Sequence, residues 1–262
     1  MADRVVGKTV VITGAARGIG EGFARALAAE GARVVIGDLN LESATAVAED
    51  LKAQGGQAAA FRVDVSRRED LSGLFDFAIE TFGGLDVVFN NAGFNVPMNF
   101  LDVTEDNWNS IMTVNGLGVL MGTQEAAKRM IARGTKGKIV NTSSIAGRQG
   151  YANIAPYCAS KAAVIMLTQA AARDLAPHGI TVNGFAPGVV NTPLWEKLDE
   201  DLMAIGASSR KGQAMEEFSQ GILVGRAALP SDLAPMAVFL ASSDSDYFTG
   251  QTIMADGGMV LV

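Results

Sequence analysis

A tyrosine and a lysine stand four positions apart in "APYCASKAAVIMLTQAAARDLAP", Ala155 to Pro177, a segment whose composition predicts a helix. That spacing places Tyr157 and Lys161 on one helix face. A free phenol has a pKa of about 10, and a neighbouring ammonium group favours the phenolate form. The pair therefore suits a general acid/base that works near neutral pH. The alternative is two amphipathic side chains whose stems cover apolar surface.

A glycine-rich turn, "TGAARGIG", stands between the first predicted strand and the first predicted helix. Gly14, Gly18 and Gly20 would let the backbone approach a pyrophosphate, and the helix N-terminus would offer N–H groups and a positive dipole end to it. A plain strand–helix connection is the alternative reading. The spacing and context predict a dinucleotide site.

An acidic residue, Asp38, ends the second predicted strand, 24 positions after Gly14. A carboxylate there accepts hydrogen bonds from ribose hydroxyls and repels a 2′-phosphate, which favours NAD over NADP. Arg17 is the one nearby cation that argues for NADP. The alternative for Asp38 is a helix cap or a solvated turn. Asp64, after the third predicted strand, can bond the adenine amino group or cap the helix that follows.

Composition excludes several classes of protein. The chain has 262 residues, 48% of them hydrophobic and 19% charged, with a net charge of -7 and no Lys/Arg block. Nucleic acid and an anionic membrane are therefore not expected as partners. One Cys and one His exclude an internal disulfide and make a His/Cys metal site untenable. No signal peptide or membrane span is found, so we expect a cytoplasmic location.

The elements that must position these residues alternate along the chain as short β-branched runs and longer helical stretches. Seven strands are predicted, several of them apolar without alternation, as strands buried on both faces should be. This order predicts a single α/β domain over residues 1–262, a Rossmann-type doubly wound parallel sheet with helices on both faces. Helices are expected at 41–54, 68–82, 105–132 and 231–241, the last capped by Ser231, and a substrate-binding lid at 191–225.

Six motifs occur in one order: "TGAARGIG", "NNAG" at 90–93, Asn115, "NTSS" with Ser144, "YCASK", and "PG" at 187–188. With this spacing the chain resembles the short-chain dehydrogenase/reductase family over nearly its whole length. The resemblance implies Tyr157 as the acid/base, with Ser144, Lys161 and Asn115 as catalytic partners. Ser144 stands at the family's interval of 13 positions before Tyr157, which makes Ser143 the weaker candidate. The family often forms tetramers, so a homotetramer is expected.

The remaining site residues follow from these motifs and from their places after strands. The substrate pocket is expected to include Phe94, Ser144, Ile145 and Trp195. The cofactor is expected to contact Gly14, Arg17, Gly18, Ile19, Gly20, Asp38, Asp64, Val65, Asn91, Ala92, Gly93, Tyr157, Lys161, Pro187, Gly188, Val190 and Thr192.

The C-terminal half resembles the acetoin/2,3-butanediol and sorbitol (polyol) branch of that family, which implies NAD-dependent interconversion of a secondary alcohol in a small diol or polyol with its ketone. Ile145 is a departure, because those relatives often carry a polar Gln after the serine. One alternative is an NADPH-dependent carbonyl reductase of the 3-oxoacyl type. Another is a non-catalytic nucleotide-sensing protein on the same fold.

Overall fold

The computed structural model of the chain describes residues 4–261, and residues 1–3 and 262, which the predicted domain includes, lie outside that range. Seven strands form one parallel sheet in the order β3-β2-β1-β4-β5-β6-β7. The sheet order reverses between β1 and β4, where Val10 pairs with Val34 on one side and Val87 on the other. The predicted fold class is confirmed. The strands are β1 Thr9–Thr13, β2 Arg33–Asp38, β3 Gln57–Arg62, β4 Val87–Asn90, β5 Lys138–Thr142, β6 Thr181–Pro187 and β7 Thr252–Ala255.

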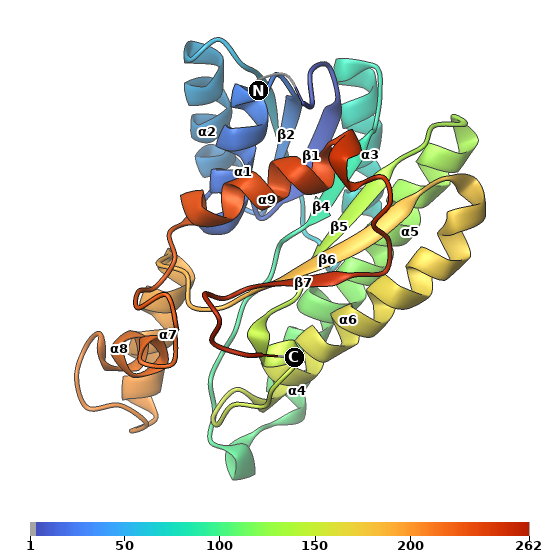
Figure 1. Cartoon of the computed structure of the whole chain (residues 1–262). Coiled ribbons are helices and arrows are strands. Elements are labelled where there is room, and N and C mark those ends of the chain that lie inside the picture. The colour runs from blue at the N-terminus through green and yellow to red at the C-terminus, as the bar shows by residue number, and fades with distance from the viewer. Residues whose placement is uncertain (1–3, 262) are drawn as a thin grey trace.

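Helices cover both faces of the sheet (Figure 1). Helices α1, α2 and α9 bury apolar side chains against one face, and α3, α5 and α6 bury theirs against the other. The strands are consequently buried on both faces, as their apolar runs predict. The α-helices are α1 Gly18–Ala29, α2 Leu41–Ala53, α3 Arg68–Phe82, α4 Glu105–Met112, α5 Gly118–Ala132, α6 Ala155–Leu175, α7 Pro193–Ala204, α8 Gln213–Ser219 and α9 Pro230–Ala241; short 3-10 turns are η1 Phe100–Asp102, η3 Ile145–Gly147, η4 Ala176–His178 and η5 Ser243–Ser245.

The helical stretch expected over 105–132 is interrupted by a π-helical turn, η2 Thr113–Leu117, between α4 and α5. A π turn widens the helix by one residue and is frequent at functional sites. Asn115 lies inside it and is fully buried. The sequence places this residue in the correct region, but the change of helix type depends on what packs around it.

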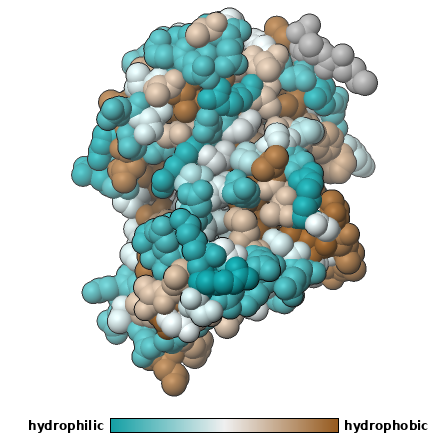
Figure 2. Space-filling model, turned by 90° about the vertical axis from the view of Figure 1, so that its left-hand side faces the viewer, coloured by the Kyte–Doolittle hydropathy of each residue, from teal (hydrophilic) through white to brown (hydrophobic). Residues whose placement is uncertain are grey.

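The start of the last helix differs from expectation. Helix α9 begins at Pro230 with Leu229 as its N-cap, so Ser231 is not the cap. Proline suits the first helical position because its φ is already helical and its missing N–H needs no partner. The segment 191–225 holds two helices, α7 and α8, which project from the main body (Figure 1). Seen from the side that carries them, the surface is mostly hydrophilic, with apolar side chains in smaller groups (Figure 2).

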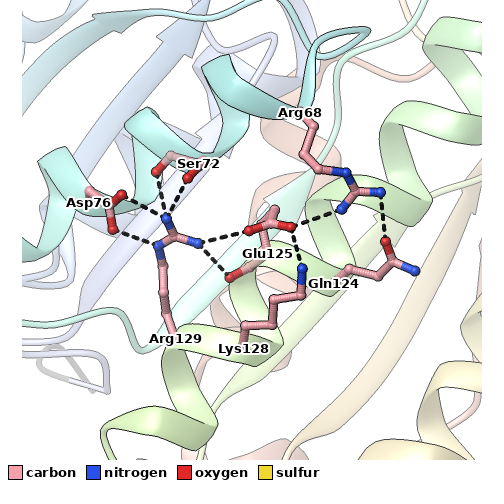
Figure 3. Close-up of polar contacts among 7 residues, drawn as sticks. All are labelled: Arg68, Ser72, Asp76, Gln124, Glu125, Lys128 and Arg129. Atoms are coloured by element: carbon pink, nitrogen blue, oxygen red, sulfur yellow. Dashed lines mark hydrogen bonds and ion pairs between the residues drawn. The ribbon is translucent and has the colours of Figure 1, made fainter.

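A cluster of charges joins α3 to α5 around Glu125 (Figure 3). The Glu125 carboxylate accepts hydrogen bonds from Arg68 at 2.8 Å, Lys128 at 2.7 Å and Arg129 at 3.1 Å. Arg129 also bonds both carboxylate oxygens of Asp76 at 2.7 Å. Burial raises the pKa of Glu125, but the hydrogen bonds from its cationic neighbours outweigh burial and lower that pKa to about 2. The cluster fixes the helix that follows Asn115.

Within residues 4–261 no helix is long and apolar enough to cross a bilayer. The same range holds no group of three or more His, Cys, Asp or Glu side chains arranged to bind a metal ion.

Candidate active site

A cleft of about 870 Å³ opens at the carboxyl ends of the strands. Doubly wound sheets bind ligands at this edge, beside the point where the strand order reverses. Most of the predicted site residues line the cleft, although they come from seven separate segments. Those residues are Gly14, Arg17, Gly18, Ile19, Asp38, Asp64, Val65, Asn91, Ala92, Gly93, Phe94, Ser144, Ile145, Tyr157, Lys161, Pro187, Gly188, Val190, Thr192 and Trp195.

The glycine turn has the geometry of a phosphate cradle. Gly14 has φ +64° and Gly18 has φ +62°, a backbone region that residues with a Cβ rarely adopt. A Cβ on Gly14 would also lie 2.8 Å from the Cα of Ala92. No side chain caps the start of α1, so the N–H groups of its first turn remain available to a ligand. These features fit the pyrophosphate of a dinucleotide.

Gly20 and Asn115 are the two predicted site residues that do not line the cleft. A Cβ on Gly20 would lie 2.3 Å from the carbonyl oxygen of Gly14. Gly20 therefore lets α1 pack against the preceding turn, and its contact with the cofactor stays a prediction. The glycine pattern alone cannot separate these roles, because both require the absence of a side chain.

Asp38 is held at the end of the cleft that would receive the adenosine ribose. Its Oδ2 atom accepts a hydrogen bond from the N–H of Ala16, and its Oδ1 atom accepts one from the N–H of Asn40, both at 3.0 Å. The cap of α2 is Asn40, not Asp38. Arg17 is exposed at the same end of the cleft. The cofactor end thus presents one fixed carboxylate and one guanidinium.

Asp64 is not a helix cap. Its Oδ1 atom accepts hydrogen bonds from the N–H of Ser66 at 2.9 Å and from the Ser66 hydroxyl at 2.6 Å. Helix α3 has Arg67 at its N-cap. The Ser66 hydroxyl lowers the pKa of Asp64 against the opposing effect of burial. Asp64 therefore presents an ionised carboxylate at the cleft wall, which leaves the adenine amino group as its expected partner.

Asn91 joins three strand ends beneath the cleft. Its Nδ2 atom donates to the carbonyls of Thr13 at 3.0 Å and Gly14 at 3.1 Å, and its Oδ1 atom accepts from the Thr142 hydroxyl at 3.3 Å. These bonds hold the ends of β1, β4 and β5 together. The bonds fix the turn after β4, where Ala92 and Gly93 border the cleft.

Tyr157 and Lys161 lie on the same face of α6, at the base of the cleft. The Nζ atom of Lys161 lies 5.5 Å from the centroid of the Tyr157 ring and donates to the carbonyl oxygen of Thr142 at 2.9 Å. Only 3% of Lys161 is exposed, and burial lowers its pKa to about 8. Nine-tenths of a long cationic side chain would not be buried merely to cover apolar surface. The amphipathic-surface alternative is therefore wrong for Lys161.

The pKa of Tyr157 differs from expectation. Burial raises it to about 12, although an interaction with the Ser144 hydroxyl opposes the rise. The expected lowering by Lys161 is not found in the protein alone, because desolvation disfavours the phenolate and the same burial weakens the charge on Lys161. Additional positive charge near the phenol is therefore needed to lower the pKa of Tyr157 toward neutral pH.

The two serines of "NTSS" have different partners. The Ser143 hydroxyl donates to the carbonyl oxygen of Lys161 at 2.8 Å and is committed to packing α6 against the sheet. The Ser144 Oγ atom accepts from the N–H of Ala146 at 3.1 Å and lies within reach of the Tyr157 phenol. The Ser144 hydroxyl thus faces the phenol rather than the backbone of α6. This geometry favours Ser144 over Ser143 as the substrate-facing serine.

The Asn115 side chain is bonded to Phe94 and Ser160. Its Oδ1 atom accepts from the N–H of Phe94 at 3.0 Å, and its Nδ2 atom donates to the carbonyl of Phe94 at 2.9 Å and to the Ser160 hydroxyl at 3.2 Å. Both amide hydrogens of the Asn115 side chain are thereby used. Asn115 holds the segment 93–95 that follows β4 beside Lys161.

A family described as short chain dehydrogenase matches residues 8–203. The chain belongs to the short-chain dehydrogenase family. It is 43% identical over 253 residues to a diacetyl reductase [(S)-acetoin forming] of Staphylococcus epidermidis, covering 97% of this chain and 98% of the relative. It is 40% identical to an L-2,3-butanediol dehydrogenase of Corynebacterium glutamicum and 40% identical to a sorbitol dehydrogenase of Cereibacter sphaeroides, with the same coverage in both cases.

Two solved structures show the same fold. Levodione reductase superposes with a TM-score of 0.90 at 30% identity, covering 97% of this chain and 98% of that one. A short-chain type dehydrogenase/reductase from Mycobacterium marinum gives 0.89 at 34% identity, covering 98% and 97%. The protein is thus an oxidoreductase of a family that uses nicotinamide nucleotides. By their names, the three relatives act on diacetyl, 2,3-butanediol and sorbitol.

The substrate end of this short-chain dehydrogenase contains residues that the sequence did not single out. Tyr151 stacks on Phe218 of α8 with ring centroids 5.5 Å apart, and Phe218 contacts Trp195 of α7 at 5.4 Å. Asn95, Ser208 and Phe218 also line the cleft. No local motif marks these residues. Only the packing of α7 and α8 over the 151–154 loop brings them together.

Proposed function

We propose that this short-chain dehydrogenase uses NAD to interconvert a secondary alcohol of a small diol or polyol with the corresponding ketone. The observation that carries the proposal is the convergence of Ser144, Tyr157 and Lys161 at the base of one cleft whose other end holds Asp38. When bound, NAD supplies the ring that accepts or returns a hydride, and its oxidised form brings one positive charge.

Tyr157 is the proposed general acid/base. In alcohol oxidation its phenolate oxygen takes the proton of the substrate hydroxyl, and in ketone reduction its phenol returns it. The raised pKa of Tyr157, about 12, makes the phenol a good acid but a poor base in the protein alone. The ammonium of Lys161, 5.5 Å from the ring, favours the phenolate, and the charge of the oxidised cofactor acts in the same direction.

Ser144 and Asn115 are the proposed partners of that proton transfer. The Ser144 hydroxyl donates a hydrogen bond to the substrate oxygen and holds it against the phenol as charge develops there. The backbone of the π turn at Asn115 holds water that exchanges protons with Lys161. The nicotinamide ring of the cofactor is bordered by four residues at the end of β6 and just after it: Pro187, Gly188, Val190 and Thr192. The Thr192 hydroxyl makes no cap bond to α7 and is available to the carboxamide.

We infer NAD rather than NADP from Asp38. Two backbone N–H groups hold its carboxylate in place, so its negative charge would repel a 2′-phosphate bound beside it. The exposed Arg17 supports the second candidate, an NADPH-dependent carbonyl reductase. The two functions differ in the ratio of kcat/KM for NAD to that for NADP.

We also propose a cytoplasmic homotetramer that takes small alcohols and ketones as its only partners, without nucleic acid or membrane. Trp108, Leu117 and Met166 are 43%, 45% and 56% exposed on α4, η2 and α6, elements that pack on one another. Such a group supports a subunit contact. Light scattering of the purified protein measures its molar mass in solution, and the mass of a monomer would contradict the proposed tetramer.

A substrate panel tests the proposed function. Diols, sugar alcohols, 2-butanol, apolar ketones and 3-oxoacyl thioesters should be assayed with NAD(H) and NADP(H). Turnover of diols or polyols with NAD supports the proposal. Turnover of only apolar ketones or 3-oxoacyl compounds with NADPH supports the second candidate instead. Binding of NAD without turnover of any compound would indicate the nucleotide-sensing alternative.

A further inference from the structure

Asn95 is a buried residue at the substrate end of the cleft whose carboxamide oxygen has no hydrogen-bond partner among the described residues. The residue is only 8% exposed. A buried polar atom without a partner costs free energy, and in native proteins such atoms are few. Because Asn95 also lines the cleft, a ligand is the natural source of the missing hydrogen bond.

The position of Asn95 is fixed relative to the catalytic group. The side chain of Asn115 bonds both backbone groups of Phe94, at 3.0 and 2.9 Å. A Cβ on Gly93 would lie 3.4 Å from the Nζ atom of Lys161. Two residues of chain span at most about 7 Å. The Cα atom of Asn95 therefore lies within about 7 Å of that of Gly93, which borders Lys161, and both residues line the same cleft.

A second unpartnered group, the hydroxyl of Tyr151, lines the same end of the cleft. The N–H of Met98 donates to the carbonyl oxygen of Asn153 at 2.8 Å, which ties the loop of Asn95 to the loop of Tyr151. Asn153 has φ +65°, a conformation that Asn tolerates better than most residues. The two unpartnered groups are thus held by one joined pair of loops.

Ile145 cannot form a hydrogen bond with a second hydroxyl group of the substrate. It is 5% exposed, lines the cleft directly after Ser144, and offers no polar side-chain atom. A small diol would leave its second hydroxyl without a partner there. Asn95 supplies an acceptor, and Tyr151 supplies a donor and an acceptor, from the opposite loops.

We infer that Asn95 and Tyr151 form a second-hydroxyl subsite, which makes the enzyme selective for vicinal diols and α-hydroxy ketones over simple secondary alcohols and ketones. The inference rests on the proposed function and names its substrate class. Sites that hydrogen-bond a substrate hydroxyl discriminate strongly against analogues that lack it, because the buried polar groups are then left unpaired.

Asn95→Leu and Tyr151→Phe test the subsite, since each removes a polar group with little change of shape. Steady-state kcat/KM should be measured with NADH for 3-hydroxy-2-butanone and for 2-butanone, which differ by one hydroxyl. The wild-type enzyme should prefer the hydroxy ketone, and each variant should lose about tenfold or more of that preference while its kcat/KM for 2-butanone stays within about threefold.

Asn99→Leu is the matched control, because Asn99 is exposed on the same loop outside the cleft. It should leave the preference unchanged. Thermal unfolding should show that the variants fold. Tyr151→Phe should not be less stable, because no residue within 4–261 bonds its hydroxyl. If Asn95→Leu does not fold, Tyr151→Phe alone decides.

The outcomes separate the subsite from the proposed function. An unchanged preference in the folded variants overturns the subsite and leaves the proposed function standing. Equal losses for both ketones also overturn it, since they indicate general damage to the cleft. A wild-type enzyme that turns over no diol, alcohol or ketone of this size overturns the proposed function and the subsite together.

Discussion

The Nζ atom of Lys161 lies 5.5 Å from the ring centroid of Tyr157 and bonds the carbonyl of Thr142, so the ammonium is held beside the phenol at a fixed distance. Both groups are desolvated, which raises the pKa of Tyr157 to about 12 and lowers that of Lys161 to about 8. Burial thus disfavours the charged form of each group, whereas an ammonium beside a phenolate favours both charged forms.

Tyr157→Phe should lower kcat for the preferred alcohol by about 10²- to 10⁴-fold, because it removes the proton carrier and little else. The dissociation constant for NAD, measured by fluorescence titration, should stay within about threefold, since the residues of the glycine turn are untouched. Tyr247→Phe is the control, because Tyr247 is fully exposed. Unchanged turnover in Tyr157→Phe would exclude the proposed acid/base.

The pH dependence of kcat/KM should differ between the two reaction directions. Alcohol oxidation needs the Tyr157 phenolate, so its rate should rise with pH, whereas ketone reduction needs the phenol and should fall at high pH. Lys161→Met should move the oxidation profile to higher pH, because the buried phenol loses a nearby positive charge.

Lys52→Met, at an exposed lysine of α2, is the control for that measurement. It should leave the profile in place. An oxidation profile in Lys161→Met that coincides with the wild-type profile would show that Lys161 does not act on the phenol.

Asp38→Asn should raise kcat/KM for NADP by about tenfold or more and lower that for NAD, because it removes a negative charge while keeping an acceptor for the Ala16 N–H. Asp50→Asn, at an exposed carboxylate of α2 that bonds Arg25, should change neither value. A wild-type enzyme that already uses NADP as well as NAD would contradict the role of Asp38.

Glu125→Gln should lower the free energy of unfolding by about 2 kcal/mol without changing kcat/KM, because it weakens three charge-assisted hydrogen bonds that are partly screened by solvent. The folded pKa of Glu125 is about 2, below its ordinary value of 4.5. This contribution is therefore complete above pH 4.5 and is lost as the pH falls toward 2.

Denaturant unfolding at pH 7 and pH 3 measures that contribution. The difference between wild type and Glu125→Gln should shrink at the lower pH. Glu49→Gln removes an exposed pair with Lys52 and should cost almost nothing at either pH. A Glu125→Gln variant as stable as Glu49→Gln at pH 7 would show that the cluster in Figure 3 is not stabilising.

The local sequence determined where the seven strands lie along the chain, where the glycine turn lies, and how far apart Tyr157 and Lys161 stand on their helix. These features depend on backbone preference and on residues within one turn or one strand, so their signal is complete in short stretches of chain. The family resemblance rests on the same stretches, and the family match confirms it.

The tertiary structure decided what depends on partners distant in sequence. It made Gly20 a packing residue, committed the Asn115 side chain to Phe94, gave Asp64 a serine partner instead of a helix, and set the direction of the Tyr157 pKa. It also placed Asn95 in the cleft with an unpartnered oxygen. Desolvation and hydrogen-bond satisfaction are properties of a complete environment, and that environment exists only once the loops after different strands have met.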